Sequence, residues 1–268
     1  MTLSDKMIEL ATSGIAKLLE TEKRMNKTYR EKGDVIHGLL IASITKLHVL
    51  VVSAPGAAKS VVANRFVRAF RHYHASNGKT HFRKLMSAAL PPDELFGMID
   101  IPLYEKTGTA RRKVDGYMPT ARTVVLDEFF RGNDSVNNTL LDQLDEQRMF
   151  RNGDTDLKVP LEFCVALSNG WYEDDQRALA DRFPLRYVSS YIAEKGSRFS
   201  MWRDRVNSAT CDIDDIDITD EELEAVHKMW SQVEVSDGSF EVLNVICEEF
   251  KKEGLQPSDR LTNYCIDL

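Results

Sequence analysis

The segment at residues 48–70, HVLVVSAPGAAKSVVANRFVRAF, constrains the fold of this chain more than any other. A continuous apolar run ends at a Pro-Gly turn, and apolar residues at helical spacing begin near Lys59. The segment therefore predicts a strand, a loop and a helix in succession. Because backbone N–H groups and the helix dipole converge at such a loop, it is a natural site for phosphate.

The loop resembles the phosphate-binding pattern GxxxxGK[ST], in which the lysine contacts the β and γ phosphates and the hydroxyl coordinates magnesium. Ser53 and Ala58 replace the two glycines, and we expect Ala58 to be turning into the helix already. A strand-to-helix turn without a ligand remains an alternative at this point. The residues expected to bind nucleotide are Pro55, Gly56, Ala57, Ala58, Lys59 and Ser60.

A second apolar run, at residues 122–128, ends in two adjacent acids, Asp127 and Glu128. On a strand downstream of a phosphate loop, Asp127 is expected to hold magnesium with Ser60, and Glu128 to act as general base on water. The alternative is a helix N-cap with acids in its first turn. A third run ends at Asn169, which would orient that water, although asparagine is also common in turns.

The apolar runs lack strict alternation, as strands buried on both faces of a parallel sheet do. A segment of helical spacing lies between the second and third runs, so we predict a doubly wound α/β fold. The chain has no strand-like run after about residue 196, which predicts an all-α second lobe. The expected helices comprise an amphipathic N-terminal one and those near 33–46, 197–207, 220–232, 239–252 and 258–268.

Composition narrows the class of protein. The net charge of −7 argues against a general nucleic-acid binder, which needs a concentrated basic surface. The four cysteines form no CxxC pair, so neither a zinc site nor a disulfide framework is indicated. Because the sequence shows no secretory signal and no apolar run of membrane-spanning length, a cytoplasmic location is expected.

Beyond these features, the chain resembles the MoxR/RavA branch of the AAA+ ATPases over nearly its whole length. The matching pieces, in order, are APGAAKS, PPDELFG, GYMPTARTVVLDEFFRGNDSVNNTLLDQLDEQRMFRNG, ALSN, ALADRFPLR, ITDEE and PSDR. Such an ordered set is highly specific. Ala58 is a substitution that this family commonly shows, whereas Ser53 departs from it.

The resemblance implies an AAA+ P-loop core with a parallel five-stranded sheet, followed by a small all-α lid. We place the core with its N-terminal helices at residues 1–193 and the lid at 194–268. A helix-2 insert would run from Phe96 to about Tyr117, and its basic residues at 111–113 are expected in an exposed hairpin or loop. The family further implies ATP and Mg²⁺ as ligands and a homo-oligomeric, hexameric ring.

By the same resemblance Asn169 is sensor 1, Arg182 is the arginine finger presented to the neighbouring subunit's ATP, and Arg260 is sensor 2. An arginine supplied in trans neutralises charge that develops on the transferred phosphoryl group. A surface ion pair is the alternative for either arginine taken alone.

The favoured function is an ATP-hydrolysing motor of a remodelling chaperone that works with a partner carrying a von Willebrand factor A domain. The alternatives are a nucleic-acid-stimulated motor and a non-hydrolysing nucleotide-binding scaffold. The acidic segment CDIDDIDITDEE at 211–222 lacks the glycine and the terminal glutamate of a calcium loop. It is expected to be a solvated linker.

Overall fold

The computed structural model describes residues 4–74, 80–207, 211–254 and 257–266. Its centre is a five-stranded sheet of order β2-β3-β6-β1-β7, in which every neighbouring pair is parallel. The strands are β1 (Val49–Ser53), β2 (His81–Leu85), β3 (Thr123–Asp127), β6 (Phe163–Ser168) and β7 (Leu185–Ser189). A separate antiparallel hairpin consists of β4 (Met149–Asn152) and β5 (Thr155–Lys158). The predicted α/β fold with a parallel five-stranded sheet is confirmed.

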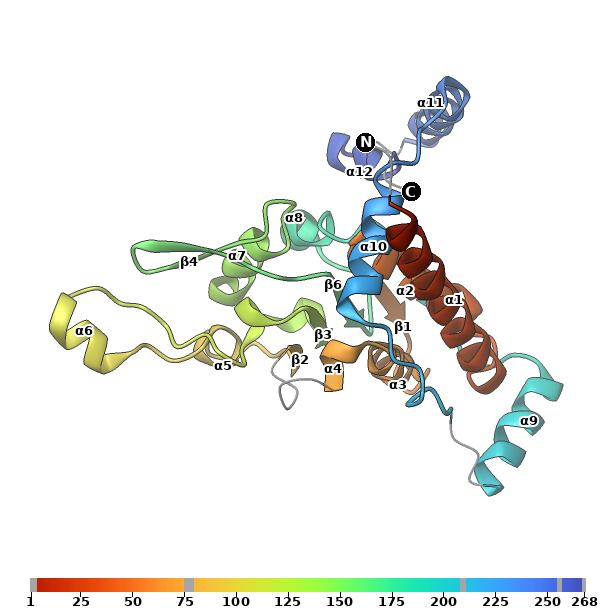
Figure 1. Ribbon diagram of the computed structural model, residues 1–268, viewed down its shortest axis with the longest axis horizontal. Coiled ribbons are helices and arrows are strands. Elements are labelled where there is room, and N and C mark those ends of the chain that lie inside the picture. Colours follow the sequence, from red (N-terminus) through yellow and green to blue (C-terminus); the bar gives the residue numbers. More distant parts are fainter. Residues whose placement is uncertain (1–3, 75–79, 208–210, 255–256, 267–268) are drawn as a thin grey trace.

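Helices cover both faces of the sheet (Figure 1). They are α1 (Asp5–Thr28), α2 (Gly33–Thr45), α3 (Lys59–Phe66), α4 (Arg71–His74), α5 (Asp93–Phe96), α6 (Ile101–Thr107), α7 (Asp134–Gln143), α8 (Arg177–Ala180), α9 (Lys195–Val206), α10 (Asp220–Trp230), α11 (Asp237–Lys252) and α12 (Asp259–Tyr264). The expected helices are present with small shifts at their ends. The last was expected to reach residue 268, but α12 ends at Tyr264, and residues 267–268 lie outside the described part.

Alternate residues of β1 enter two different apolar clusters. Val49 and Val51 pack with side chains from α2 and α3, whereas Leu50 and Val52 pack with side chains from α5, α7 and α8. All five residues of β1 are buried. This two-sided burial explains why the apolar runs of the sequence show no alternation, and it fixes the sheet as the middle of three layers.

Helix α10 packs along α1, so the first and last quarters of the chain meet in one layer (Figure 1). A Cβ atom on Gly14 would lie 3.0 Å from Cγ2 of Val226, so glycine permits this close approach. Lys17 on α1 forms a 2.7 Å ion pair with Glu222. The division at residue 193 remains a proposal, and this packing places α10 with the N-terminal helices.

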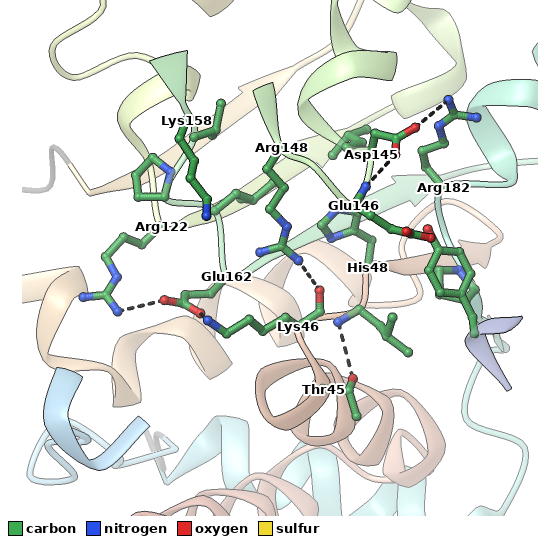
Figure 2. Close-up of a pocket in the computed structure, with 17 residues that line it drawn as sticks. Thr45, Lys46, His48, Arg122, Asp145, Glu146, Arg148, Lys158, Glu162 and Arg182 are labelled. Carbon is green, nitrogen blue, oxygen red and sulfur yellow. Dashed lines mark hydrogen bonds and ion pairs between the residues drawn. The ribbon is translucent and has the colours of Figure 1, made fainter. Parts of the chain in front are cut away.

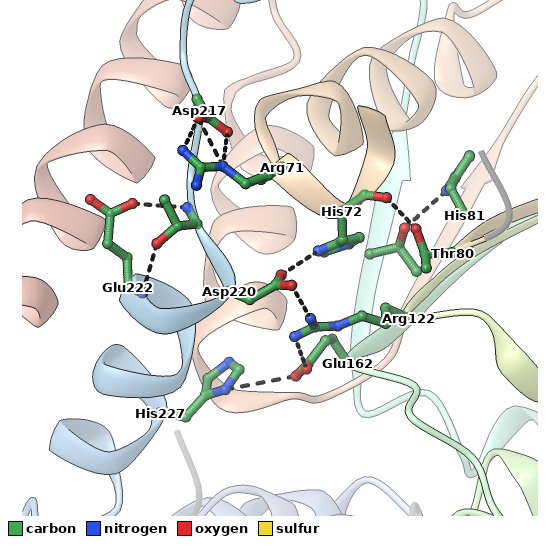
Figure 3. Close-up of polar contacts among 12 residues, drawn as sticks. Arg71, His72, Thr80, His81, Arg122, Glu162, Asp217, Asp220, Glu222 and His227 are labelled. Atoms are coloured by element: carbon green, nitrogen blue, oxygen red, sulfur yellow. Dashed lines mark hydrogen bonds and ion pairs between the residues drawn. The ribbon is translucent and has the colours of Figure 1, made fainter. Parts of the chain in front are cut away.

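The acidic segment before α10 is not a solvated linker, and that expectation was wrong. Ile213, Ile216 and Ile218 are buried in the core cluster on the α2 side of the sheet. The carboxylates between them pair with basic side chains of the preceding helices, as Asp217 does with Arg71 (Figure 3). The alternation of isoleucine and acid therefore anchors this segment to the core.

A buried polar network holds the start of α10 to the sheet (Figure 3). Arg122 lies 2.7 Å from a carboxylate oxygen of Asp220 and 2.8 Å from one of Glu162. Burial lowers the pKa of His72, which faces Asp220, and that of His227, which faces Glu162, to about 4 each. Both imidazoles are therefore neutral near pH 7.

The expected insert forms an arm that extends from the sheet together with the β4-β5 hairpin (Figure 1). Ile99 and Arg112 form an antiparallel bridge at its base, and the Asn152 side chain accepts from the backbone N–H of Arg112 at 2.6 Å. Arg111 forms a 2.7 Å ion pair with Asp154. The expected hairpin is thus present, but its arginines are paired with neighbouring acids.

Candidate nucleotide site

The loop after β1 adopts the conformation that its glycine allows. Gly56 has φ +80°, and an added Cβ would meet no atom within 4 Å, so the backbone angle is what favours glycine there. Ala58 also has a left-handed conformation, with φ +64°, and α3 begins one residue later. Ala58 turns into the helix as expected, since its carbonyl accepts a 3.0 Å hydrogen bond from the N–H of Val62. The expectation that alanine is favoured over glycine there was wrong, because the left-handed conformation costs alanine about 1–2 kcal/mol.

Ser53 is the last residue of β1 and is buried. Its hydroxyl donates a 3.1 Å hydrogen bond to the carbonyl of Ala54. The replacement of glycine by serine therefore falls within the extended strand, before the turn. The segment after β7 also holds the loop, because the Tyr191 hydroxyl donates a 2.7 Å hydrogen bond to the carbonyl of Pro55.

Side chains from three strand ends meet at the carboxyl edge of the sheet. Lys59 donates a hydrogen bond to the side-chain oxygen of Asn169, whose side-chain N–H group donates in turn to Glu128. The Ser60 hydroxyl lies 2.6 Å from Oδ2 of Asp127. These residues end or follow the strands β1, β3 and β6, which are adjacent in the sheet.

Glu128 stands in a strained turn. Its φ of +52° is left-handed, a conformation that costs a non-glycine residue of order 1–3 kcal/mol and that clusters at functional sites. Nε of Arg131 lies 3.2 Å from its second carboxylate oxygen. A cavity of about 320 Å³ lies beside Glu128 and Asn169. Sequence reasoning missed Arg131, although its place three residues after Glu128 was a signal.

Arg182 and Arg260 lie elsewhere, at the amino edge of the sheet. Each places an Nη2 atom 3.1 Å from the same Asp145 oxygen (Figure 2 shows Arg182 and Asp145). Within the described residues, neither arginine forms a hydrogen bond or ion pair with the cluster at the carboxyl edge. Buried donors Nε of Arg182 and Nη1 of Arg260 have no partner in that part of the chain.

A cavity of about 590 Å³ adjoins Arg182 (Figure 2). Arg148 lines it with φ +48°, donates a hydrogen bond to the carbonyl of Lys46, and has its pKa lowered by burial. No pattern in the sequence had singled out Arg148 or Asp145. The basic side chains that line the cavity outnumber the acidic ones; they are Lys46, Arg122, Arg148, Lys158 and Arg182 against Asp145, Glu146 and Glu162.

The sheet order and the cluster at its carboxyl edge define the class of protein as an AAA+ ATPase fold. Residues 16–224 match the family described as the MoxR domain in the MoxR-vWA-beta-propeller ternary systems, and the chain belongs to that family.

The proteins that this chain resembles in sequence are longer than the chain. Two uncharacterized proteins of Methanocaldococcus jannaschii are 34% and 33% identical over 173 and 172 residues, each covering 64% of this chain. The matches cover 43% and 44% of those proteins, so the chain spans less than half of their length. A structural protein of Acidianus two-tailed virus is 28% identical over 186 residues, which is 69% of this chain and 29% of that protein.

Among solved structures, the fold is similar to a protein from Cytophaga hutchinsonii that is named as a candidate ATPase. The TM-score is 0.68 at 20% identity, and the match covers 97% of this chain and 79% of the other. At that identity the likeness supports the fold alone. Over the described residues, no helix combines the length and apolar character needed to cross a bilayer.

Proposed function

We propose that this chain binds MgATP and hydrolyses it as the cytoplasmic motor of a MoxR-type remodelling chaperone. The observation that carries the proposal is the hydrogen-bonded chain from Lys59 through Asn169 to Glu128, beside the Ser60–Asp127 pair. A phosphate-binding lysine, a neutral amide and a base in contact with one another are the parts that hydrolysis of a phosphoanhydride needs.

The loop and its lysine would hold the phosphates. Backbone N–H groups of residues 56–60 and the N-terminus of α3 supply donors, and the ammonium of Lys59 supplies charge. The hydroxyl of Ser60 and the carboxylate of Asp127 offer hard oxygen ligands side by side, which suits Mg²⁺. When bound there, Mg²⁺ would neutralise phosphate charge.

Glu128 would take a proton from the attacking water, and Asn169 would orient that water. Because Asn169 accepts from Lys59 and donates to Glu128, it sets the base relative to the group that contacts phosphate. The intact base favours hydrolysis over a scaffold that only binds nucleotide. No comparable feature favours a nucleic-acid motor, because the arginines of the insert are paired with acids.

The arginines at the amino edge would act on a neighbouring subunit in a ring, with Arg182 as arginine finger and Arg260 as sensor 2. Asp145 holds both in one place, and each keeps a buried donor without a partner in the described residues. A phosphate oxygen of the neighbour's nucleotide is the kind of acceptor that would replace Asp145. Six subunits are the number we propose.

The family's description suggests that a protein with a von Willebrand factor A domain is the partner. The test is to measure MgATP turnover by the purified chain alone, with such a protein, and with double-stranded DNA. We expect turnover that the protein partner changes and DNA does not. Stimulation by DNA alone would replace the chaperone with a nucleic-acid motor, and bound MgATP without turnover would support a scaffold.

A further inference from the structure

Helix α9 carries an apolar stripe without a partner. None of its residues is buried, and Phe199, Trp202 and Val206 are 48%, 53% and 83% exposed. Their spacing of three and four residues puts them on one side of the helix, where the Phe199 and Trp202 rings lie 5.6 Å apart. A contiguous apolar face of this kind usually marks a contact surface.

Helix α11 carries a second such stripe. It also has no buried residue, and Val242, Val245 and Ile246 are 60%, 59% and 46% exposed at helical spacing. Within this chain the two helices do not cover each other, because α11 lies at the upper right and α9 at the lower right, far apart (Figure 1).

The charges beside the two stripes are opposite. On α9, Arg203 and Arg205 flank the apolar residues, and neither has an ion-pair partner in the described part of the chain. On α11, Glu241 and Glu248 lie about one turn before and after Val245, and Glu249 follows Glu248. The pairs that Glu248 and Glu249 make with lysines on their own helix are exposed, and such pairs are weak.

The contacts beside α9 place it near the carboxyl edge of the sheet, and those beside α11 place it near the amino edge. These are the two edges that neighbouring subunits of a ring would bring together. The segment that leads to α9 runs past the phosphate loop. It is held by the hydrogen bond from the Tyr191 hydroxyl to the carbonyl of Pro55, and by the backbone N–H groups of residues 193 and 194, which donate to Glu31. Helix α11 leads into α12, whose Arg260 shares Asp145 with Arg182. A head-to-tail contact that brings one copy's Arg182 to its neighbour's loop also brings α11 toward that neighbour's α9.

We propose that the apolar stripe of α9 is covered by α11 of a second copy of this chain, with Arg203 and Arg205 facing its glutamates. The contact rests on the proposed ring, but not on nucleotide hydrolysis. It gives each subunit a helical cover supplied by its neighbour.

Disulfide cross-linking tests which chain supplies the cover. Trp202→Cys and Val245→Cys are combined in a chain whose natural Cys247 and Cys265 are changed to serine. On mild oxidation with MgATP we expect covalent dimers and higher species. The matched control is Leu19→Cys with Val245→Cys, since Leu19 is 52% exposed on α1, away from the stripe. Only intrachain cross-links, or no more cross-linking than the control, would overturn the proposal.

Charge reversal gives an independent measurement by light scattering. Arg203→Glu with Arg205→Glu, and Glu241→Arg with Glu248→Arg, should each lose assembly when alone. Mixed in equal amounts they should assemble in alternation, because every α9 then meets an α11 of opposite charge. If all four changes in one chain restore assembly but the mixture does not, the contact is intrachain and the proposal is wrong.

MgATP binding and turnover are measured in the same samples, so that failure of the proposed function can be told apart from failure of the α9–α11 contact. MgATP binding that requires Lys59, with recovered turnover in mixed Glu128→Gln and Arg182→Ala rings, would uphold the motor even if no α9–α11 cross-link forms. Conversely, interchain cross-links in a chain that binds no MgATP would uphold the contact and remove the motor. Normal assembly with loss of a von Willebrand factor A partner in Arg203→Glu/Arg205→Glu would assign α9 to that partner instead.

Discussion

The two edges of the central sheet differ in how their functional side chains are assembled. At the carboxyl edge, the neutral amide of Asn169 joins a cation, Lys59, to an acid, Glu128. At the amino edge, an acid, Asp145, joins two cations, Arg182 and Arg260. We proposed the first edge as the part of a nucleotide site that one chain supplies, whereas the arginines of the second edge keep donors without a partner in the described residues. Under the proposed function, a complete site would combine the two edges from two copies of the chain.

The strongest test of this contrast is Arg182→Ala. We expect turnover to fall by about 10³- to 10⁵-fold, as loss of an arginine finger does. Mixed with Glu128→Gln subunits, the variant should regain turnover, because some sites then combine an intact Glu128 with a neighbour's Arg182. Arg177→Ala, an exposed arginine on α8, serves as the control. Absence of recovery in rings shown to be mixed would mean that Arg182 does not act in trans.

Next in size is the effect of Glu128→Gln at the carboxyl edge. Loss of the general base should lower turnover by about 10²- to 10⁴-fold and leave MgATP binding intact. Lys59→Ala should instead abolish tight binding, because the lysine contacts phosphate in the ground state. Binding and steady-state hydrolysis are measured separately. Undiminished turnover in Glu128→Gln would remove this residue from the mechanism.

Acid should weaken the amino edge. Burial lowers the pKa of His72, His81 and His227 to about 4, below the ordinary 6.5 of the unfolded chain. Between these values the unfolded chain binds more protons, so stability is full above pH 6.5 and falls as the pH drops toward 4. Each histidine contributes about 3 kcal/mol to this loss.

Urea unfolding at pH 7.5, 6.5 and 5.5 measures that loss. His227→Gln, which keeps a donor for the carbonyl of Ser43, should show a shallower dependence on pH than the natural chain. Identical pH dependence in the two proteins would show that His227 does not contribute to the loss of stability in acid.

Arg260→Ala tests whether the second arginine of the amino edge acts on the same nucleotide as Arg182. Losing a hydrogen bond to a charged group costs about 1.5–3 kcal/mol, so turnover should fall about ten- to a hundredfold. Since Arg260 shares Asp145 with Arg182, mixing with Glu128→Gln should restore turnover and mixing with Arg182→Ala should not. The reverse pattern would show that Arg260 acts on its own chain's nucleotide.

The smallest effect concerns the two replaced glycines. Ser53→Gly should change MgATP affinity by less than about tenfold, or 1.4 kcal/mol, because Ser53 lies within the strand. Ala58→Gly should tighten binding more than Ser53→Gly does, since it relieves the left-handed alanine. If the natural chain binds no MgATP and Ser53→Gly restores binding, the loop is a relic and the scaffold hypothesis replaces the motor.

The two edges also differ in how far the sequence predicts them. Lys59, Asp127 and Asn169 each follow or end a recognisable apolar run, and parallel strands bring their carboxyl ends to one edge, so their proximity could be predicted. The meeting of Arg182 with Arg260 depends on where α12 packs. No local pattern encodes that packing, and Asp145 sits in an ordinary turn after α7.

The prediction that the acidic segment at 211–222 is a solvated linker was wrong for a related reason. Its carboxylates read as solvated because charge usually favours exposure, yet three isoleucines between them are buried and basic helices supply counter-charges. Those helices are distant in sequence, so only tertiary structure reveals the pairing. Likewise, the left-handed backbone of Ala58 follows from the loop's geometry rather than from the helix propensity of alanine.

The packing of α10 along α1 affects how the protein folds during its synthesis on the ribosome. The α1 surface around Gly14 leaves the ribosome well before the Val226 side chain that covers it has been made. Until then the nascent domain presents an apolar groove where α10 belongs. Folding of this layer therefore finishes only after α10 has been synthesised, and a chain released before residue 220 would be a client for the chaperones that shield newborn proteins.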